Sequence, residues 1–246
     1  MPWDFALILF MLGVVIPWRG ARRFRQVLNR PALTSLERLS LYASTIAFQW
    51  VTTAVVAWRV WARRVPLVEL GVGIPQGELT VTVTAGLVAL LVTTQIFSLR
   101  RLAALPPARR GTLGSVAERL MPQNTIERLV FVGLAATAGL CEEFVYRGFV
   151  LAVLARAAGS SILVGVGASS LLFALAHFYQ GPRGMVVTFF AGLLFAGVRV
   201  WTSSLAPAVI GHFAADLTAG MAARRMLRST GGAAGNVGPG GAGILY

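Results

Sequence analysis

The strongest constraint on this chain is a series of apolar blocks, each roughly 16–25 residues long. A helix of about 20 apolar residues spans the hydrocarbon core of a bilayer, where every backbone polar group must find its partner inside the protein. Charged residues make up 13% of the 246 residues, against about 25% in soluble domains. The pattern predicts an all-α protein, a polytopic membrane helix bundle.

The blocks predict seven membrane segments. In chain order they are Trp3–Trp18, Leu41–Trp58, Leu79–Leu99, Leu129–Leu154, Ser161–Phe178, Met185–Trp201 and Leu205–Ala223. We expect basic loops at Arg19 to Arg38 and at Arg100–Arg128, and an exposed connection at Pro66–Glu78. Residues 1–228 are expected to form one integral-membrane domain, followed by a disordered, Gly-rich tail at 229–246.

The net charge of +13 does not indicate a nucleic-acid partner. Most of the basic residues lie between the apolar blocks, where the positive-inside rule puts them, and membrane lipid is the expected partner. Their distribution predicts an outside N-terminus and a cytoplasmic C-terminus in a cell membrane. All of them are Arg, which fits a GC-rich bacterial genome. The single cysteine, Cys141, allows no internal disulfide and no Cys-x-x-Cys metal site.

Three acidic residues and both histidines that fall inside the predicted apolar segments mark the candidate site. They are Glu142, Glu143, His177, His212 and Asp216. A carboxylate in the hydrocarbon core costs about 2.5–3.5 kcal/mol on insertion scales. Such residues are kept where they face a protein interior or a wet cavity, which makes each a functional-site hypothesis.

The spacing of these residues suggests separate roles for the two adjacent glutamates. Glu143 and Arg147 are four apart, so they share a helix face and can form an ion pair. Glu142 points about 100° away and is free to act as a general base. A buried pair that only fixes helix packing is the alternative for Glu143 and Arg147.

The two histidines carry their own alternatives. His177 lies near the end of its segment, where a histidine can simply be a hydrogen-bonded or interfacial residue. His212 and Asp216 are four apart, so the carboxylate can orient the imidazole or form a polar contact between helices. Small residues in the same segments are expected to let the helices approach closely; among them are Gly133, Gly139, Gly165, Gly167, Gly192 and Gly197.

Three motifs on successive segments resemble one family of membrane proteins. They are Glu-Glu-x-x-x-Arg ending at Arg147, Phe-x-x-x-His ending at His177, and His-x-x-x-Asp ending at Asp216. This order is similar to that of the CAAX prenyl endopeptidase and bacteriocin-processing (CPBP, Abi) family of intramembrane proteases. The resemblance covers roughly residues 122–220, beginning at Pro122-x-x-x-x-Glu127, and upstream the segments match only in hydropathy.

The resemblance implies a role for each residue. Glu142 would activate a water that it shares with His177, and Glu143 with Arg147 would form a supporting pair. His212 and the fourth residue after it would steady the oxyanion of the tetrahedral intermediate. The prenyl endopeptidases have Asn at that fourth position, whereas this chain has Asp216, and an ionised Asp repels an oxyanion.

The function expected from this resemblance is hydrolysis of a peptide bond at or in the membrane, in a peptide or membrane-protein substrate. No cofactor is favoured, since no His-Glu-x-x-His helix is present. The family is often described as metalloproteases, and Glu142, His177 and His212 would then ligate zinc. The alternatives are a proton-coupled transporter and an inactive family member that acts as an immunity protein or scaffold. The sequence does not indicate an oligomeric state.

Overall fold

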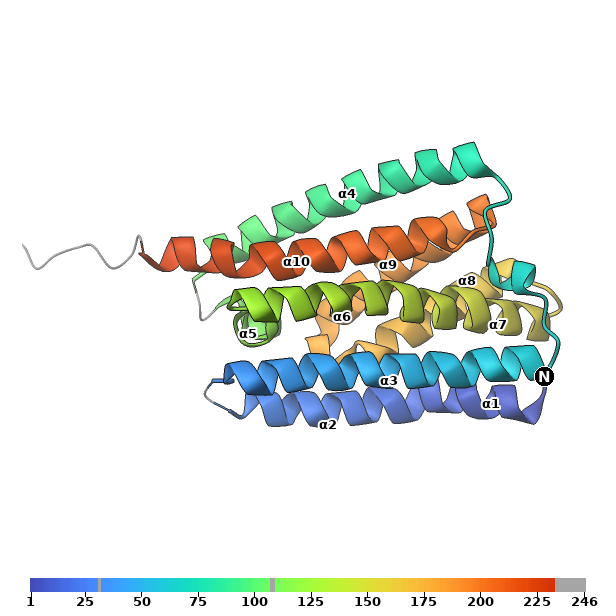
Figure 1. Cartoon of the computed structure of the whole chain (residues 1–246), viewed down its shortest axis with the longest axis horizontal. Coiled ribbons are helices and arrows are strands. Elements are labelled where there is room, and N and C mark those ends of the chain that lie inside the picture. The colour runs from blue at the N-terminus through green and yellow to red at the C-terminus, as the bar shows by residue number, and fades with distance from the viewer. Residues whose placement is uncertain (31, 107–108, 233–246) are drawn as a thin grey trace, which may run out of the picture.

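The computed structural model describes residues 1–30, 32–106 and 109–232, which form a bundle of helices without strands. Helix α10 (Ala206–Gly232) packs between α4 (Gly77–Ala104) and α6 (Thr125–Glu143), as Figure 1 shows. Helix α3 (Ser35–Ala62) packs against α6 as well, with α1 and α2 beside it in Figure 1. The predicted all-α bundle is therefore confirmed.

The remaining elements complete the bundle in chain order. They are α1 (Trp3–Phe10), the π-helical η1 (Met11–Val15), α2 (Ile16–Leu28), the 3₁₀ turn η2 (Leu67–Leu70), α5 (Gly111–Leu120), the π-helical η4 (Phe144–Val150), α7 (Leu151–Ala157), α8 (Ile162–Ala176), the 3₁₀ turn η5 (Phe178–Gln180) and α9 (Gly181–Thr202). Helix α8 packs against α7 and α9.

Each predicted membrane segment corresponds to one helix or to one continuous run of helices. Among the described residues, five such stretches are long and apolar enough to cross a membrane: Trp3–Leu28, Ser35–Ala62, Gly77–Ala104, Thr125–Ala157 and Phe178–Thr202. Helix α8 is apolar but has only 15 residues, and α10 is not among the five. The number of seven spans therefore stays a prediction.

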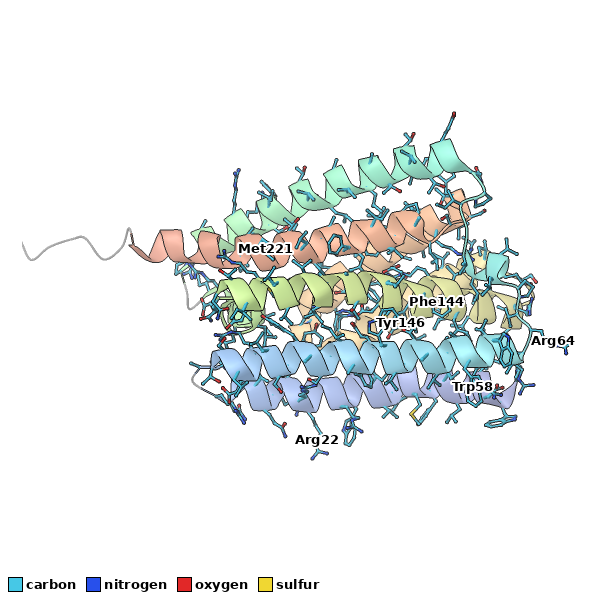
Figure 2. The ribbon with its side chains drawn as sticks, in the orientation of Figure 1. Arg22, Trp58, Arg64, Phe144, Tyr146 and Met221 are labelled. Carbon is cyan, nitrogen blue, oxygen red and sulfur yellow. The ribbon has the colours of Figure 1, made fainter. Side chains whose placement is uncertain are left out.

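The two stretches predicted as basic loops are in large part helical, and that prediction was wrong. Helix α2 continues to Leu28, and α5 lies within the second stretch. A helix that leaves the apolar core can continue because long arginine side chains reach the polar interface. Arg22 does this on α2: its guanidinium lies 5.0 Å from the Trp18 ring centroid, and Figure 2 shows the side chain pointing away from the bundle.

The C-terminal tail was expected from residue 229. Helix α10 instead extends to Gly232, four residues into that stretch, and residues 233–246 lie outside the described part of the chain.

A buried ion pair joins the start of α3 to the start of α6. Arg38 Nε lies 2.9 Å from Glu127 Oε2, and Arg38 Nη2 lies 3.2 Å from Glu127 Oε1. The two side chains are 6% and 0% exposed. Glu127 Oε2 also accepts the backbone N–H of Gln123 at 2.6 Å, and Asn124 caps the helix by accepting the Glu127 N–H at 2.9 Å. Arg38 is thus a structural charge, although the sequence placed it in a loop.

A buried carboxylate in the first predicted segment escaped the sequence analysis. Asp4 in α1 is buried, and it accepts hydrogen bonds from Arg59 and Arg63 near the end of α3. This contact holds α1 against α3, so part of the charge in this region serves packing.

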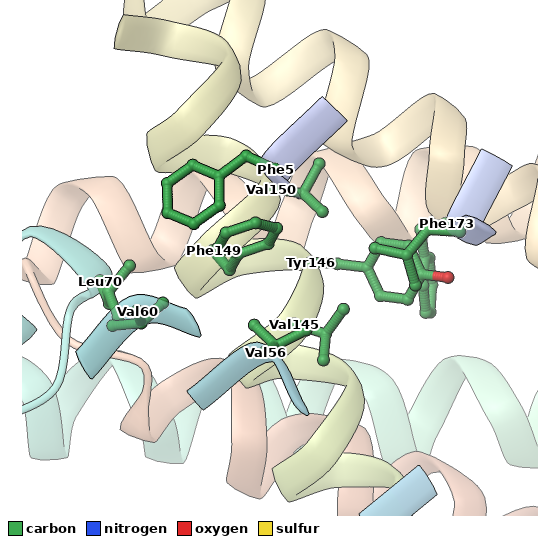
Figure 3. Close-up of a cluster of buried hydrophobic side chains, with 10 residues drawn as sticks. Phe5, Val56, Val60, Leu70, Val145, Tyr146, Phe149, Val150 and Phe173 are labelled. Carbon is green, nitrogen blue, oxygen red and sulfur yellow. The ribbon is translucent and has the colours of Figure 1, made fainter. Parts of the chain in front are cut away.

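The main apolar core surrounds η4, which follows directly on the two glutamates. Phe149 and Val150 are fully buried there, and Phe5 of α1 packs edge-on against Phe149 at 5.0 Å between ring centroids. Figure 3 shows how side chains from α1, α3, η2 and α8 meet around this segment. π-Helical turns interrupt α-helices mostly at functional sites, and this one carries Arg147.

We predict that Arg38→Met lowers the free energy of unfolding by about 3–5 kcal/mol, because it leaves the Glu127 carboxylate buried without its partner. The measurement is chemical unfolding of the purified protein in detergent. The matched control is Arg30→Met, which breaks the exposed Arg30–Glu37 pair and should cost less than about 1 kcal/mol. Equal losses for the two variants would contradict the structural role given to Arg38.

Candidate active site

Two of the predicted site residues, Glu142 and His177, line a common cavity inside the bundle. Glu142 lies in the last turn of α6, and His177 follows the last residue of α8. His177 Nε2 lies 3.9 Å from Glu142 Oε2, and the side chains are 16% and 20% exposed. The cavity has a volume of about 190 Å³ and is bounded by residues of η1, α2, α3, α6, η4, α8 and η5. A liquid water occupies about 30 Å³, so there is room for water and part of a ligand.

The backbone fixes the orientation of the His177 ring. His177 Nδ1 lies 2.9 Å from the Phe173 carbonyl oxygen, one helical turn earlier. A carbonyl only accepts, so Nδ1 carries the proton of this hydrogen bond. In the neutral ring Nε2 is then an acceptor, and it is the atom that faces Glu142. This is the tautomer that a water-activating histidine needs.

The structure adds a residue that the sequence analysis missed. Gln49 of α3 donates a hydrogen bond from Nε2 to Glu142 Oε1 at 2.5 Å. Gln49 lies outside residues 122–220, the stretch that carries the family resemblance. The signal for it was present in the sequence, since Thr45, Gln49 and Thr53 recur every four residues and so share one helix face.

Buried polar atoms of two residues around the cavity have no hydrogen-bond partner in the described part of the chain. They are Gln49 Oε1 and Glu142 Oε2, and both residues line the cavity. A buried donor or acceptor without a partner costs about 1–3 kcal/mol. The cavity wall is therefore prepared to bind a polar ligand or water.

A second group of site residues lies buried beside the cavity. Glu143 Oε1 accepts a hydrogen bond from Arg147 Nη1 at 2.9 Å, and both side chains are fully buried. His212 Nδ1 lies 2.8 Å from the same oxygen. The sequence predicted the pairing with Arg147 and missed the one with His212, which joins α6 to α10.

Aromatic rings separate this buried group from the cavity. The Arg147 guanidinium lies over the Phe173 ring at 3.9 Å from its centroid, a cation–π contact. Phe173 also contacts the rings of His177 at 4.6 Å, Tyr146 at 5.3 Å and His212 at 5.9 Å, between centroids. Phe173 thus contacts His177 at the cavity as well as Arg147 and His212 in the buried group. Its position one turn before His177 allows both sets of contacts.

The His212 ring is held from three sides. It stacks on Phe195 with centroids 5.5 Å apart and an angle of 15° between planes, and its Nε2 lies 3.6 Å from Asp216 Oδ2. The Asp216 side chain is 41% exposed. Neither His212 nor Asp216 is among the residues that line the cavity, so the structure brings Glu142 and His177 together there and places the other four residues behind them.

Residues 124–218 match the family model described as Rce1-like, Type II CAAX prenyl endopeptidase Rce1-like. By this match the segment is similar to CAAX proteases. It contains all six predicted site residues and leaves α3, with Gln49, outside the match. Comparison with curated proteins and with solved structures found no significant match. In the structure, α3 completes the cavity from outside the matched segment.

The family resemblance offers Glu142, His177 and His212 as alternative zinc ligands. In the part of the chain that the structure describes, no three His, Cys, Asp or Glu side chains are grouped as metal ligands. His212 Nδ1 is engaged by Glu143, whereas Glu142 and His177 face the cavity. As these side chains are placed, Glu142, His177 and His212 are not grouped as one set of metal ligands, and the absence of a cofactor stays a prediction.

Close packing of α6 on α10 brings His212 to Glu143. A Cβ atom added at Gly139 would lie 2.8 Å from the Val209 carbonyl oxygen of α10. The predicted packing role is confirmed for Gly139, and Gly165 and Gly192 have equally close neighbours. Gly133 has open space around it, which places it outside the contact although it lies on the same helix.

We predict that Gly139→Ala destabilises the fold by about 1–3 kcal/mol, because the added methyl group must push α10 away from α6. Unfolding in detergent measures this loss. The matched control is Gly133→Ala, which should be neutral or stabilise by up to about 1 kcal/mol, since Ala favours a helix and meets no neighbour. The packing account fails if both alanines have the same effect.

Proposed function

We propose that the protein is an intramembrane endopeptidase in which Glu142 and His177 activate a water molecule. The observation that carries this proposal is the separation of 3.9 Å between Glu142 Oε2 and His177 Nε2 on the wall of one cavity. That distance is too long for a direct hydrogen bond and short enough for one water to contact both atoms. Both atoms are acceptors, so the water donates one hydrogen to each.

The hydrolytic step then uses these two side chains. Glu142 takes a proton from the water as general base, and the water oxygen forms a bond to the scissile carbonyl carbon. The C–N bond breaks as that proton passes to the leaving amine nitrogen. The products are a carboxylic acid, which keeps the second hydrogen of the water, and a new amine, with Glu142 returned to its ionised form.

The buried group supports this step without touching the water. Glu143 neutralises Arg147 and holds His212, which keeps the end of α6 in register with α10. The oxyanion role that the family resemblance implies for His212 and Asp216 stays a prediction. In the structure, His212 Nε2 lies 3.6 Å from Asp216 Oδ2.

The proposed substrate is a peptide or a segment of a membrane protein, and the proposed location is a cell membrane with membrane lipid around the bundle. The proposed orientation has the N-terminus outside and the C-terminus cytoplasmic. Arg38 is a buried partner of Glu127, yet residues 19–38 and 100–128 still hold 11 of the other 21 arginines. The proposal does not require a prenylated substrate.

We predict that Glu142→Gln lowers kcat/KM by at least about 100-fold, because the amide is no base. The protein is purified into lipid vesicles and given quenched-fluorescence peptides, with and without a prenylated cysteine. The control is Glu78→Gln, which neutralises an exposed carboxylate at the start of α4 and should retain activity. Equal cleavage by both variants would contradict the proposal. So would vesicles without cleavage in which Glu142→Gln alters proton-coupled uptake.

We predict that Asp216→Asn changes kcat/KM by less than about threefold, because the side chain is partly exposed and away from the cavity. Asparagine also keeps the shape of the residue. The comparison variant is Glu143→Gln, which leaves Arg147 buried without a counter-charge and should cost about 3–5 kcal/mol of stability. A loss of activity in Asp216→Asn as large as that of Glu142→Gln would contradict the position of Asp216 away from the cavity.

A further inference from the structure

A polar face of α3 borders the cavity beside Glu142. Thr45, Gln49 and Thr53 lie one turn apart on this face. Thr45 Oγ1 donates to the Leu41 carbonyl oxygen at 2.8 Å, so its hydroxyl is used within the helix, and the Thr53 side chain hydrogen-bonds with Cys141. Gln49 Oε1 is buried and has no hydrogen-bond partner among the described residues. The unused polar atom of these three side chains therefore belongs to the residue that contacts Glu142.

The nitrogen and the oxygen of the Gln49 side-chain amide have different roles. Its Nε2 donates to Glu142 Oε1 at 2.5 Å, which leaves Glu142 Oε2 as the oxygen nearer to His177. Since a carboxylate only accepts, the amide nitrogen must be the end that faces it. The amide oxygen is then an unused acceptor on a residue that lines the cavity.

The lining of the cavity indicates which ligand would use that acceptor. Among the residues that the structure describes, no Arg lines it and Glu142 is its one acidic residue, so an anionic group such as a phosphate would find no Arg counter-charge. A peptide backbone brings N–H donors that must be satisfied at membrane depth. A carbonyl oxygen on the wall and apolar neighbours such as Leu12, Ile16 and Val145 suit such a segment.

We propose that Gln49 is a positioning residue for Glu142 and a binding residue for the substrate backbone. Its Nε2 holds the carboxylate, and its Oε1 accepts a peptide N–H close to the scissile bond. This inference rests on the proposed peptidase function and assigns a role to α3, which lies outside the family segment.

The test compares Gln49→Met with the wild-type protein in lipid vesicles, using a quenched-fluorescence peptide rich in Ala and Leu. Methionine keeps the length of the side chain and removes both hydrogen bonds. We expect kcat to fall about tenfold and KM to rise by about three- to tenfold. The control is Val51→Met on the same helix, at a side chain 62% exposed, which should change neither constant. Unchanged kcat and KM in Gln49→Met would overturn the inference and leave the peptidase function standing.

A second measurement separates backbone binding from a general loss of shape. The peptide is N-methylated at one amide after another around the cleavage site. For the wild-type protein, one methylated position should raise KM by about tenfold, whereas Gln49→Met should be insensitive to methylation at that position. Equal sensitivity of the two proteins at every position would show that Gln49 accepts no backbone N–H.

Binding is also measured without cleavage, so that the two proposals can fail separately. His177→Ala and the double variant His177→Ala with Gln49→Met are titrated with the labelled peptide in vesicles. We expect the double variant to bind at least about threefold more weakly. If the wild-type protein cleaves no peptide, the peptidase function fails, and this binding comparison still decides the role of Gln49. Equal binding, or no binding by either variant, would overturn the inference.

Discussion

The structure depends on one buried carboxylate, Glu143. An ionised group at membrane depth is costly unless it is paired, and this one contacts Arg147 one turn ahead and His212 on α10. The same oxygen serves both partners, so the pairing fixes the helix end and the neighbouring helix together. Arg147 in turn rests on the Phe173 ring of α8. The contacts of Glu143 and Arg147 thereby hold α6, α8 and α10 in one arrangement around the buried carboxylate.

This arrangement separates the two adjacent glutamates. Glu143 accepts its hydrogen bonds inside the bundle. Glu142, one residue earlier, lines the cavity and contacts His177 and Gln49. Phe173 stands between the two groups: its carbonyl oxygen orients His177, and its ring contacts His212 and Arg147. The rigid buried group thus positions the one carboxylate that remains available for chemistry, as preorganised catalytic sites require.

Much of this was predictable from the sequence, because helix periodicity and hydropathy are local properties. The all-α fold follows from the apolar blocks, and the Glu143–Arg147 pair follows from a spacing of four. Contacts between distant helices could not be predicted in this way. Gln49 with Glu142, His212 with Glu143, and Arg38 with Glu127 each join residues 69–93 positions apart. The ends of α2 and α5 were missed for another reason, since arginine-rich segments near an interface can be helix or loop.

The central claim is that Glu142 and His177 act together on one water. The most direct measurement compares kcat/KM of Glu142→Gln, His177→Ala and the variant with both changes, under the same vesicle conditions. Residues that act as a unit are non-additive, so the double variant should be no slower than the slower single variant. Losses that multiply in the double variant would show independent roles and contradict a shared water.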